Sequence, residues 1–522
     1  MKRGNSKPFW SYTKEKRKDP PKTILTYDNK TLSDTKDILN AFNAHFSKSY
    51  NQNKSNYSPD FSQTDISSDH FHLSYVTEND VDKEIRSLAK NKPPGPDGIP
   101  PSIYIECVSQ LKLPLTKIFN TSLKFNTFPS ALKDSIVTPV PKKPNENDIS
   151  GYRPISNLNI AAKIFEGILY NKVSTHIFKQ ISPKQHGFVN KKSTVSNLVE
   201  FTDYVARRLS KAEVHTVYVD VEKCFDRLHH DAILHKLVLA GFSKPLVTFF
   251  ASYLRERRIF VRYKNMSTHN NTNSTNTNPD DYSNTPVNSS FQPIIPPSGI
   301  AQGSKLSSLL FILTYNDIHK HVRHSEILMY ADDVKIFKTI QSENDCYQLQ
   351  EDLDSLTRWL ATIGLNFHPK KSFVMAYTVK RKRPASPHIY KINNVNLQYV
   401  DQYKDLGVTF ESDLNFNIHR YEVETKGFQR LGMVHRYTKP VHDIDVIQIL
   451  YQALVRSVLE YGSVLWLPHT KSGAKSLERI QARFVLIVQA LKTLCDFPNP
   501  SSFHSLPFLI LNNLFPEKLR AL

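Results

Sequence analysis

The sequence has few cysteines and no long apolar run, and both shortages limit what the protein can be. Its cysteines are scattered without any C-x-x-C spacing, so we expect neither a zinc knuckle nor a disulfide framework: Cys107, Cys224, Cys346 and Cys495. No stretch approaches the roughly 20 apolar residues that a membrane span requires. The basic residues at the N-terminus are not followed by the apolar segment of a secretory signal. We therefore expect an intracellular protein, nuclear or cytoplasmic, that is neither secreted nor embedded in a membrane.

Positive charge is the dominant feature of the composition. The 522 residues include 68 Lys and Arg against 49 Asp and Glu, which leaves a net charge of +19. Such an excess suits a polyanionic partner such as nucleic acid. Apolar residues make up 39% of the chain, which is enough for buried cores in the roughly three domains that this length suggests.

Two adjacent acids interrupt an apolar stretch at residues 330–333. Asp332 and Asp333 lie between the apolar segments 327–329 and 334–337. A simple hairpin turn would explain them on their own, because Asp is common in turns. Two ionised carboxylates in an apolar hairpin would, however, repel each other and lose hydration unless cations balance them. With a further acid nearby, the pattern predicts a metal-binding pair.

The central third of the chain alternates between strand and helix patterns. Val217, Val219 and Val221 alternate onto one face of a predicted strand, which places Asp220 on the opposite face at its end. A helix near residues 306–313, the Asp-Asp hairpin, a helix near 349–363 and a strand at 372–377 follow. This order predicts an α+β fold with a split βαβ sheet. Asp220 would then lie beside the hairpin; the alternative is an edge-strand acid in water.

Three carboxylates that face one point can hold two divalent ions about 4 Å apart, as in enzymes of phosphoryl transfer. Mg²⁺ prefers a few carboxylates together with water and substrate phosphates. The acids and the positive charge of the chain therefore both favour an enzyme that handles phosphate.

Eight segments resemble motifs of reverse transcriptases, in the style of non-LTR (LINE, jockey-like) retrotransposons. The palm motifs are at 218–226 (YVDVEKCFD), 299–304 (GIAQGS), 330–333 (YADD) and 403–408 (YKDLGV). The fingers motifs are at 92–99 (KPPGPDGI), 136–143 (IVTPVPKK), 152–156 (YRPIS) and 185–188 (QHGF). The resemblance covers roughly residues 80–490, and residues 9–12 resemble the segment that precedes the polymerase in such elements.

The resemblance implies a right-hand polymerase with fingers, a ferredoxin-like split βαβ palm and a helical thumb. The expected parts are a polar leader or linker at 1–75 with one helix near 37–46, fingers at 76–215 with the reverse transcriptase domain starting near 120, a palm at 216–411 with a low-complexity insertion at 265–290, and a thumb with a C-terminal tail at 412–522.

The resemblance also assigns the metal site. Asp220, Asp332 and Asp333 would hold two Mg²⁺ ions, for which Mn²⁺ may substitute, with the backbone carbonyl of Val221 as a further ligand. Phe225 would lie against the incoming sugar and leave no room for a 2′-hydroxyl, which favours deoxynucleotides. A simple core position is the alternative for Phe225.

Further residues would contact the nucleotide and the template. Gln302 and Gly303 would lie against the nascent pair, with Gly permitting close backbone approach. Lys142 and Arg153 would grip the triphosphate, although Lys142 also reads as a solvated surface lysine with Lys143 as a competitor.

Two groups of basic residues complete the assignment. Lys371 would protonate the pyrophosphate, with Lys370 as its rival. In the thumb, the candidates for contact with the nucleic-acid backbone are Lys471, Lys475, Arg479 and Arg483, for which a hydrated helix face is the alternative.

The expected function is an RNA-directed DNA polymerase that extends a DNA primer on an RNA template with dNTPs. Ala301 and Ser307-Ser308 stand where the family usually shows proline, which alters the rigidity of that loop. No endonuclease region precedes the polymerase, so we expect a truncated or domesticated copy. The competing hypotheses are an RNA-copying RNA polymerase and a catalytically inactive relic that binds nucleic acid. The sequence does not indicate which proteins, if any, are its partners.

Overall fold

The computed structural model describes residues 24–53, 70–73, 75–144, 146–263, 292–379, 388–438, 443–468 and 470–494. They form two compact units, one ending at Leu414 and the other beginning at Asn415. The segment 9–12 and the expected insertion at 265–290 lie outside the described residues. Among the helices of the described part, none combines the length and the apolar character needed to cross a bilayer.

A five-stranded sheet is the centre of the first unit. Its order is β12-β9-β5-β8-β7, and β5 runs antiparallel to both of its neighbours. The strands are β5 (Glu213–Val219), β7 (Glu326–Tyr330), β8 (Asp333–Ile340), β9 (Phe373–Tyr377) and β12 (Gln398–Tyr399). The chain order of β5, helices, the β7–β8 hairpin, a helix and β9 is the predicted one, and the α+β class is confirmed.

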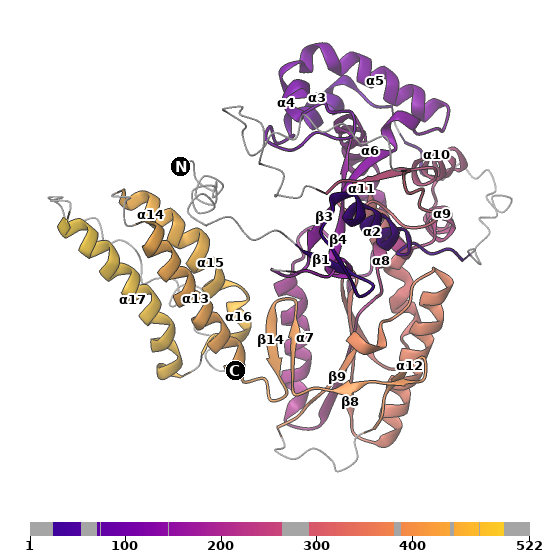
Figure 1. The fold of residues 1–522 in the computed structure, drawn as a ribbon. Helices are drawn as coiled ribbons and strands as arrows, with labels where there is room; N and C mark the ends of the chain where they lie inside the picture. The colour runs from indigo at the N-terminus through magenta and orange to yellow at the C-terminus, as the bar shows by residue number, and fades with distance from the viewer. Residues whose placement is uncertain are drawn as a thin grey trace. The chain divides into compact units, whose positions relative to one another are not determined.

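The two faces of this sheet are covered by different helices, α7 (Thr194–Leu209) and α12 (Glu343–Thr362), which flank β8 and β9 in Figure 1. On one face Phe201 of α7 makes edge contacts with the rings of Tyr218 and Phe337. On the other face, Val217 and Ile336 join a core with the leucines of α12. Because strand side chains alternate, one sheet can bury both faces.

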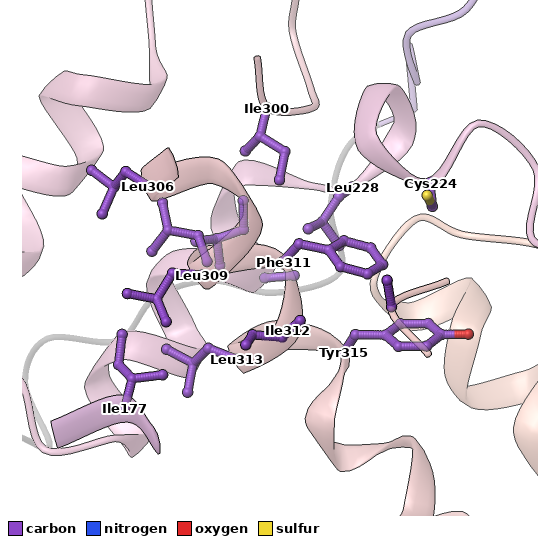
Figure 2. Close-up of a cluster of buried hydrophobic side chains, with 14 of the residues drawn as sticks. Ile177, Cys224, Leu228, Ile300, Leu306, Leu309, Phe311, Ile312, Leu313 and Tyr315 are labelled. Atoms are coloured by element: carbon purple, nitrogen blue, oxygen red, sulfur yellow. The ribbon is translucent and has the colours of Figure 1, made fainter. Parts of the chain in front are cut away.

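Helix α11 (Lys305–Tyr315) lies in the main core. Burial raises the pKa of Tyr315, its last residue, and the charges of Asp332 and Asp333 add to the rise, so the helix ends near these acids. Its side chains Leu306, Leu309 and Phe311 pack among residues from several helices (Figure 2). Complete burial of each such side chain stabilises the fold by about 1.5–3 kcal/mol. The burial of its side chains fixes the position of α11, and therefore also the end of the loop that precedes it.

The first unit also contains a second sheet, two small hairpins and further helices. A three-stranded sheet has the order β4-β3-β6, with β3 (Asp134–Pro141), β4 (Tyr152–Leu158) and β6 (Arg258–Val261). The helices are α3 (Glu78–Arg86), α4 (Pro101–Glu106), α5 (Val108–Lys124), α6 (Ile160–Phe178), α8 (Cys224–Arg227), α9 (His230–Leu239) and α10 (Lys244–Leu254). Short 3₁₀ turns are η2 (Ser130–Leu132), η3 (Ile149–Gly151), η5 (Asn316–His321) and η6 (Pro369–Lys371). Small hairpins pair β10 (Lys391–Ile392) with β11 (Val395–Asn396) and β13 (Gln402–Asp405) with β14 (Val408–Glu411).

Part of the expected leader is folded. Residues 25–47 form β1 (Leu25–Tyr27), β2 (Lys30–Leu32) and α2 (Thr35–Ser47). Ile38, Phe42 and Phe46 recur at four-residue spacing on α2, and they are buried in one cluster with Val137 of β3. The expectation of a loose leader is therefore wrong for this segment, because an apolar helical stripe is present within a polar composition.

The second unit is a group of helices with a core of its own. It contains α13 (Asn417–Thr438), α14 (Ile444–Tyr451), the π-helical segment η7 (Gln452–Arg456), α15 (Ser457–Glu460), α16 (Ser463–Trp466) and α17 (Lys471–Leu494). The ring of Tyr451 stacks on Phe484 with 3.9 Å between centroids. Ile447 and Ile480 are buried in the same cluster, so α14 and α17 both line this core.

Candidate active site

The two adjacent acids lie at the tight end of the β7–β8 hairpin. Tyr330 pairs with Asp333 across the hairpin, so Ala331 and Asp332 form a two-residue turn. Ala331 has a φ of 57°, the left-handed conformation that such hairpin turns use. Asp332 is therefore at the tip and Asp333 begins β8.

Asp220 lies beside this hairpin because of the strand register. Val219, the last residue of β5, pairs with Val334 of β8. Asp220, which directly follows β5, therefore lies opposite Asp333. An isolated bridge then joins Val221 to Phe367. The backbone bonds around it use the carbonyls of Asp220 and Asn366, not that of Val221.

Burial, together with the neighbouring carboxylates, raises the pKa values of Asp220 and Asp333. Burial raises the pKa of Asp333 to about 7, and the charges of Asp332, Asp405 and Asp220 act in the same direction. Burial also raises the pKa of Asp220, with Asp332 adding to the rise and Lys371 opposing it. The three predicted metal ligands thus interact electrostatically at one end of the palm sheet.

Two of the carboxylates have other partners. The Nζ atom of Lys371 lies 3.8 Å from Oδ2 of Asp220, and the thiol of Cys224 donates to Oδ2 of Asp332 at 3.2 Å. Within the described ranges, no three Asp, Glu, His or Cys side chains are gathered closely enough to hold a metal ion. The oxygen donors suit Mg²⁺, and their mutual repulsion is what a cation would relieve, but the side chains would have to reorient to share one.

The turn that carries Asp332 is braced from a separate segment. Gln185 is fully buried, and its Oε1 accepts from the backbone nitrogens of Ala331 at 2.9 Å and Gly187 at 2.8 Å. Asn197 donates its Nδ2 to the carbonyl of Met329 at 3.0 Å. The sequence marked Gln185 and Gly187 only as parts of a fingers motif, because no local pattern reveals which backbone they meet.

Basic side chains lie next to Asp220. Lys142 directly follows β3, and its Nζ donates to the carbonyl of Ser150 at 3.3 Å. Burial lowers the pKa of Lys142, and the neighbouring cations of Lys371 and Arg153 lower it further. Lys142, Arg153 and Lys371 are therefore close enough to repel one another.

Phe225 is half-buried at the beginning of α8. Its ring stacks on Phe311 of α11 with 4.9 Å between centroids and 16° between planes. One face of Phe225 thus has a core partner, and the ring still keeps part of its surface exposed.

Gln302 and Gly303 lie in the loop that leads into α11. The carbonyl of Gln302 accepts from the backbone nitrogen of Ser156 at 2.9 Å. Gly303 has a φ of 111°, and a Cβ atom there would lie 3.2 Å from the carbonyl oxygen of Ser156. The loop consequently rests against β4, and the conformation of Gly303 favours glycine.

The four predicted thumb cations belong to the second unit. Lys471 is the first residue of α17. Lys475, Arg479 and Arg483 are exposed, and their four-residue spacing places them on one face of the helix.

Half of the sequence matches a known protein family. Residues 140–410, just over half of the chain, match the family described as reverse transcriptase (RNA-dependent DNA polymerase). The chain belongs to the reverse transcriptase family. The resemblance noted in the sequence is thereby confirmed, and the matched segment contains Asp220, Asp332 and Asp333.

Several relatives of this reverse transcriptase-family chain come from mobile elements. It is 26% identical over 437 residues to the probable RNA-directed DNA polymerase from transposon BS of Drosophila melanogaster, over 80% of this chain and 44% of that protein. It is 24% identical over 426 residues to the RNA-directed DNA polymerase from mobile element jockey of the same species, over 79% and 43%. A solved apo telomerase from Candida tropicalis aligns with a TM-score of 0.36 and 12% identity over 57% of this chain and 59% of that chain. The chain spans less than half the length of these two Drosophila relatives.

A buried ion pair near the acids was not predicted. Lys335 of β8 and Asp405 of β13 are both buried and are joined by a hydrogen-bonded salt bridge. The Lys335 ammonium also lies 4.8 Å from the ring centroid of Phe201. This pair connects β8 to the 403–408 motif, which contains Asp405. Lys335 lies outside the sequence motifs, so no sequence signal pointed to the pair.

Proposed function

We propose that this chain is an RNA-directed DNA polymerase of retrotransposon origin. It extends the 3′-hydroxyl of a DNA primer with dNTPs on an RNA template and releases pyrophosphate. The observation that carries the proposal is the position of Asp220 beside the Asp332-Asp333 hairpin, at one end of adjacent palm strands, within a segment of the reverse transcriptase family.

The same acids are the proposed metal ligands. Asp220, Asp332 and Asp333, with the carbonyl of Val221, would hold two Mg²⁺ ions, or Mn²⁺ in their place. When bound, the ions activate the primer hydroxyl and stabilise the leaving oxygen. Burial raises the pKa values of Asp220 and Asp333, and repulsion from neighbouring carboxylates adds to the rise. This supports the assignment, because a bound cation would offset both effects.

Basic residues beside the acids would handle the triphosphate. Lys142 directly follows β3 and Arg153 lies on β4. Both lie near Lys371, so they are suited to bind phosphate oxygens. Lys371 would protonate the leaving pyrophosphate; its Nζ lies 3.8 Å from Oδ2 of Asp220, which supports this assignment. This contact favours Lys371 over Lys370.

The remaining residues would select the nucleotide and hold the duplex. The ring of Phe225, fixed by its stack on Phe311, would exclude a 2′-hydroxyl. Gln302 and Gly303 would lie against the nascent pair. The cationic face of α17, with Lys475, Arg479 and Arg483 after Lys471, would contact the phosphate backbone.

Primer extension tests the proposal. Purified protein is incubated with poly(A), an oligo(dT) primer, labelled dTTP and Mg²⁺ or Mn²⁺. We expect the wild type to extend the primer and Asp332→Ala to lose extension. Asp203→Ala is the matched control, because Asp203 is an exposed acid on α7 paired with Arg207, and it should extend normally. Equal signal from wild type and Asp332→Ala would contradict the assigned site.

A second candidate is a catalytically inactive protein that binds nucleic acid. It is favoured by the contact of Lys371 with Asp220 and by the lack of a gathered metal cluster in the described part of the chain. The two functions separate in one comparison. If the protein is inactive, the wild type will not extend the primer with either Mg²⁺ or Mn²⁺. The wild type and Asp332→Ala will nevertheless bind an RNA–DNA hybrid with equal affinity.

A further inference from the structure

A buried carboxylate lies under the loop that carries Gln302. Asp226 of α8 is only 5% exposed, and its Oδ1 accepts a hydrogen bond of 2.8 Å from Nε2 of Gln302. Neither the proposed metal site nor the proposed triphosphate contacts use Asp226. Among the described residues, the side-chain amide of Gln302 makes no other hydrogen bond.

The chemistry of this bond fixes the direction of the amide. An ionised carboxylate can only accept hydrogen bonds, so the nitrogen of the Gln302 side chain must face Asp226. The side-chain carbonyl oxygen then faces away from it and remains available as an acceptor. A neutral amide at position 226 would remove this constraint, because it can either donate or accept.

Asp226 keeps its charge under ordinary assay conditions. Burial raises its pKa to about 6, while the bond from Gln302 and the cations of Lys223 and Lys142 oppose the rise. The carboxylate is therefore mostly ionised near pH 8. Tyr50 also faces this carboxylate, and the charge of Asp226 adds to the effect of burial in raising the pKa of that tyrosine.

The backbone around Asp226 holds the same loop. Ser298 donates its Oγ to the carbonyl of Asp226 at 2.8 Å, and the nitrogen of Ile300 donates to the carbonyl of Phe225 at 2.7 Å. Gly299 has a φ of 83°, and a Cβ atom there would lie 2.5 Å from the carbonyl oxygen of Asp226. The loop thus lies directly on the backbone of α8.

A second buried acid holds the far end of the loop. Glu166 of α6 is 2% exposed and accepts from Oγ of Ser304 at 2.6 Å and from the hydroxyl of Tyr253 at 2.7 Å. Ser304 also caps α11 by accepting from the nitrogen of Ser307. The backbone of the loop is held by Glu166 at its end and by α8 along its length. The orientation of the Gln302 side chain is set separately, by its hydrogen bond to Asp226.

We propose that Asp226 is a positioning residue that orients the side chain of Gln302 and presents its carbonyl oxygen to the template and the nascent pair. The inference rests on the proposed polymerase function, since that function places Gln302 against the nascent pair. It predicts that the effect of Asp226 on catalysis passes through Gln302.

A double-mutant cycle tests the inference. Steady-state extension is measured with varied dTTP for wild type, Asp226→Asn, Gln302→Ala and the double variant. We expect Asp226→Asn to lower kcat/KM for dTTP about tenfold, a change of about 1.4 kcal/mol, with the primer–template Kd unchanged. In the Gln302→Ala background the same substitution should change kcat/KM less than twofold. An equal loss in both backgrounds, or a wild-type kcat/KM for Asp226→Asn, would overturn the inference.

Asp352→Asn is the control for loss of a buried carboxylate. Asp352 is 1% exposed and accepts from the backbone nitrogens of Arg323 and His324, away from the loop. The folded Asp352→Asn protein should have the same kcat/KM for dTTP as the wild type. Thermal unfolding of the same four cycle proteins checks the contact without activity: Asp226→Asn should shift Tm less in the Gln302→Ala background, and identical shifts would count against the inference. A wild type that does not extend at all would instead refute the proposed function, and the positioning function would fall with it.

Discussion

Gly187 and Ala331 are in direct backbone contact: a Cβ atom at position 187 would lie 2.2 Å from the backbone nitrogen of Ala331. The contact joins a motif that precedes α7 to the turn that carries Asp332. Real Cβ atoms do not approach backbone so closely, so a side chain at 187 would displace the turn. The absence of a side chain at this position is thus a condition for the geometry of the proposed metal site.

Gly187→Ala should therefore reduce primer extension by at least about tenfold, equivalent to about 1.4 kcal/mol in the barrier, and should lower the Tm. The matched control is Gly432→Ala on α13, where a Cβ atom would meet nothing within 4 Å. The control should keep wild-type activity, because alanine is well tolerated in a helix. Wild-type extension by Gly187→Ala would show that the turn tolerates the displacement.

Mg²⁺ should stabilise the protein more at pH 8 than at pH 5. The folded-state pKa of Asp333 is about 7, above its ordinary value. Between the unfolded and folded pKa values, the folded state holds a proton that the unfolded state has lost, so the stability contributed by Asp333 falls as pH rises through this window. Above pH 7 the ionised carboxylate is repelled by Asp332 and Asp220, and a bound cation removes that repulsion. Differential scanning calorimetry with and without Mg²⁺ measures the effect. Asp333→Asn should flatten the pH dependence, and an equal Mg²⁺ shift at both pH values would argue against Asp333 as a ligand.

Phe225→Ala should increase the use of ribonucleotides. Removal of the ring opens the space where a 2′-hydroxyl would sit, so the ratio of kcat/KM for UTP to that for dTTP should rise about tenfold, or about 1.4 kcal/mol. Phe225→Tyr keeps the ring and should keep the discrimination. Unchanged selectivity in Phe225→Ala would indicate that the ring is only a core contact with Phe311.

Neutralising the cations of α17 should weaken the salt dependence of nucleic-acid binding. Each phosphate contact that is lost should reduce the slope of log K against log[salt] by about 0.7–0.9. Lys475→Gln and Arg479→Gln, alone and together, are measured by fluorescence anisotropy with an RNA–DNA hybrid at several salt concentrations. Lys426→Gln is the control, because Lys426 lies on α13 and is paired with Glu422. Slopes equal to that of the control would mean that this face of α17 only faces water.

Breaking the buried Lys335–Asp405 pair should be costly for stability. Lys335→Met leaves the Asp405 carboxylate buried without its partner, which should lower the free energy of unfolding by about 3–5 kcal/mol. Replacing both residues, as in Lys335→Met with Asp405→Leu, should cost less than the single change, since no buried charge is left. Chemical denaturation compares the variants. A double variant as unstable as Lys335→Met would show that the pair has little coupling.

The parts of the fold that could be predicted have strong local periodicity. The alternation of Val217 and Val219 located β5, and the four-three leucine spacing located α12. The position of Asp220 beside the Asp332-Asp333 hairpin could be predicted from the order of the elements, because β5 and the hairpin are neighbours in a split βαβ sheet.

The parts that could not be predicted depend on contacts between distant segments. Gln185 meets the turn at Ala331 across 146 residues, and Asp226 meets Gln302 across 76 residues. The helix near 37–46 was expected, but its packing against Val137 of β3 was not, because that contact also joins distant segments. In each case the sequence supplies the residue, whereas tertiary packing decides its partner.

The burial of α2 has a practical consequence for the boundaries of this protein. The family match begins at residue 140, within β3, whereas the cluster that supports β3 and β4 extends back to Leu25. A fragment trimmed to the matched segment would lack Phe42 and Phe46 and would leave Tyr152 and Ile259 open to solvent. Expression of the reverse transcriptase-family region in soluble form therefore calls for a start before residue 25.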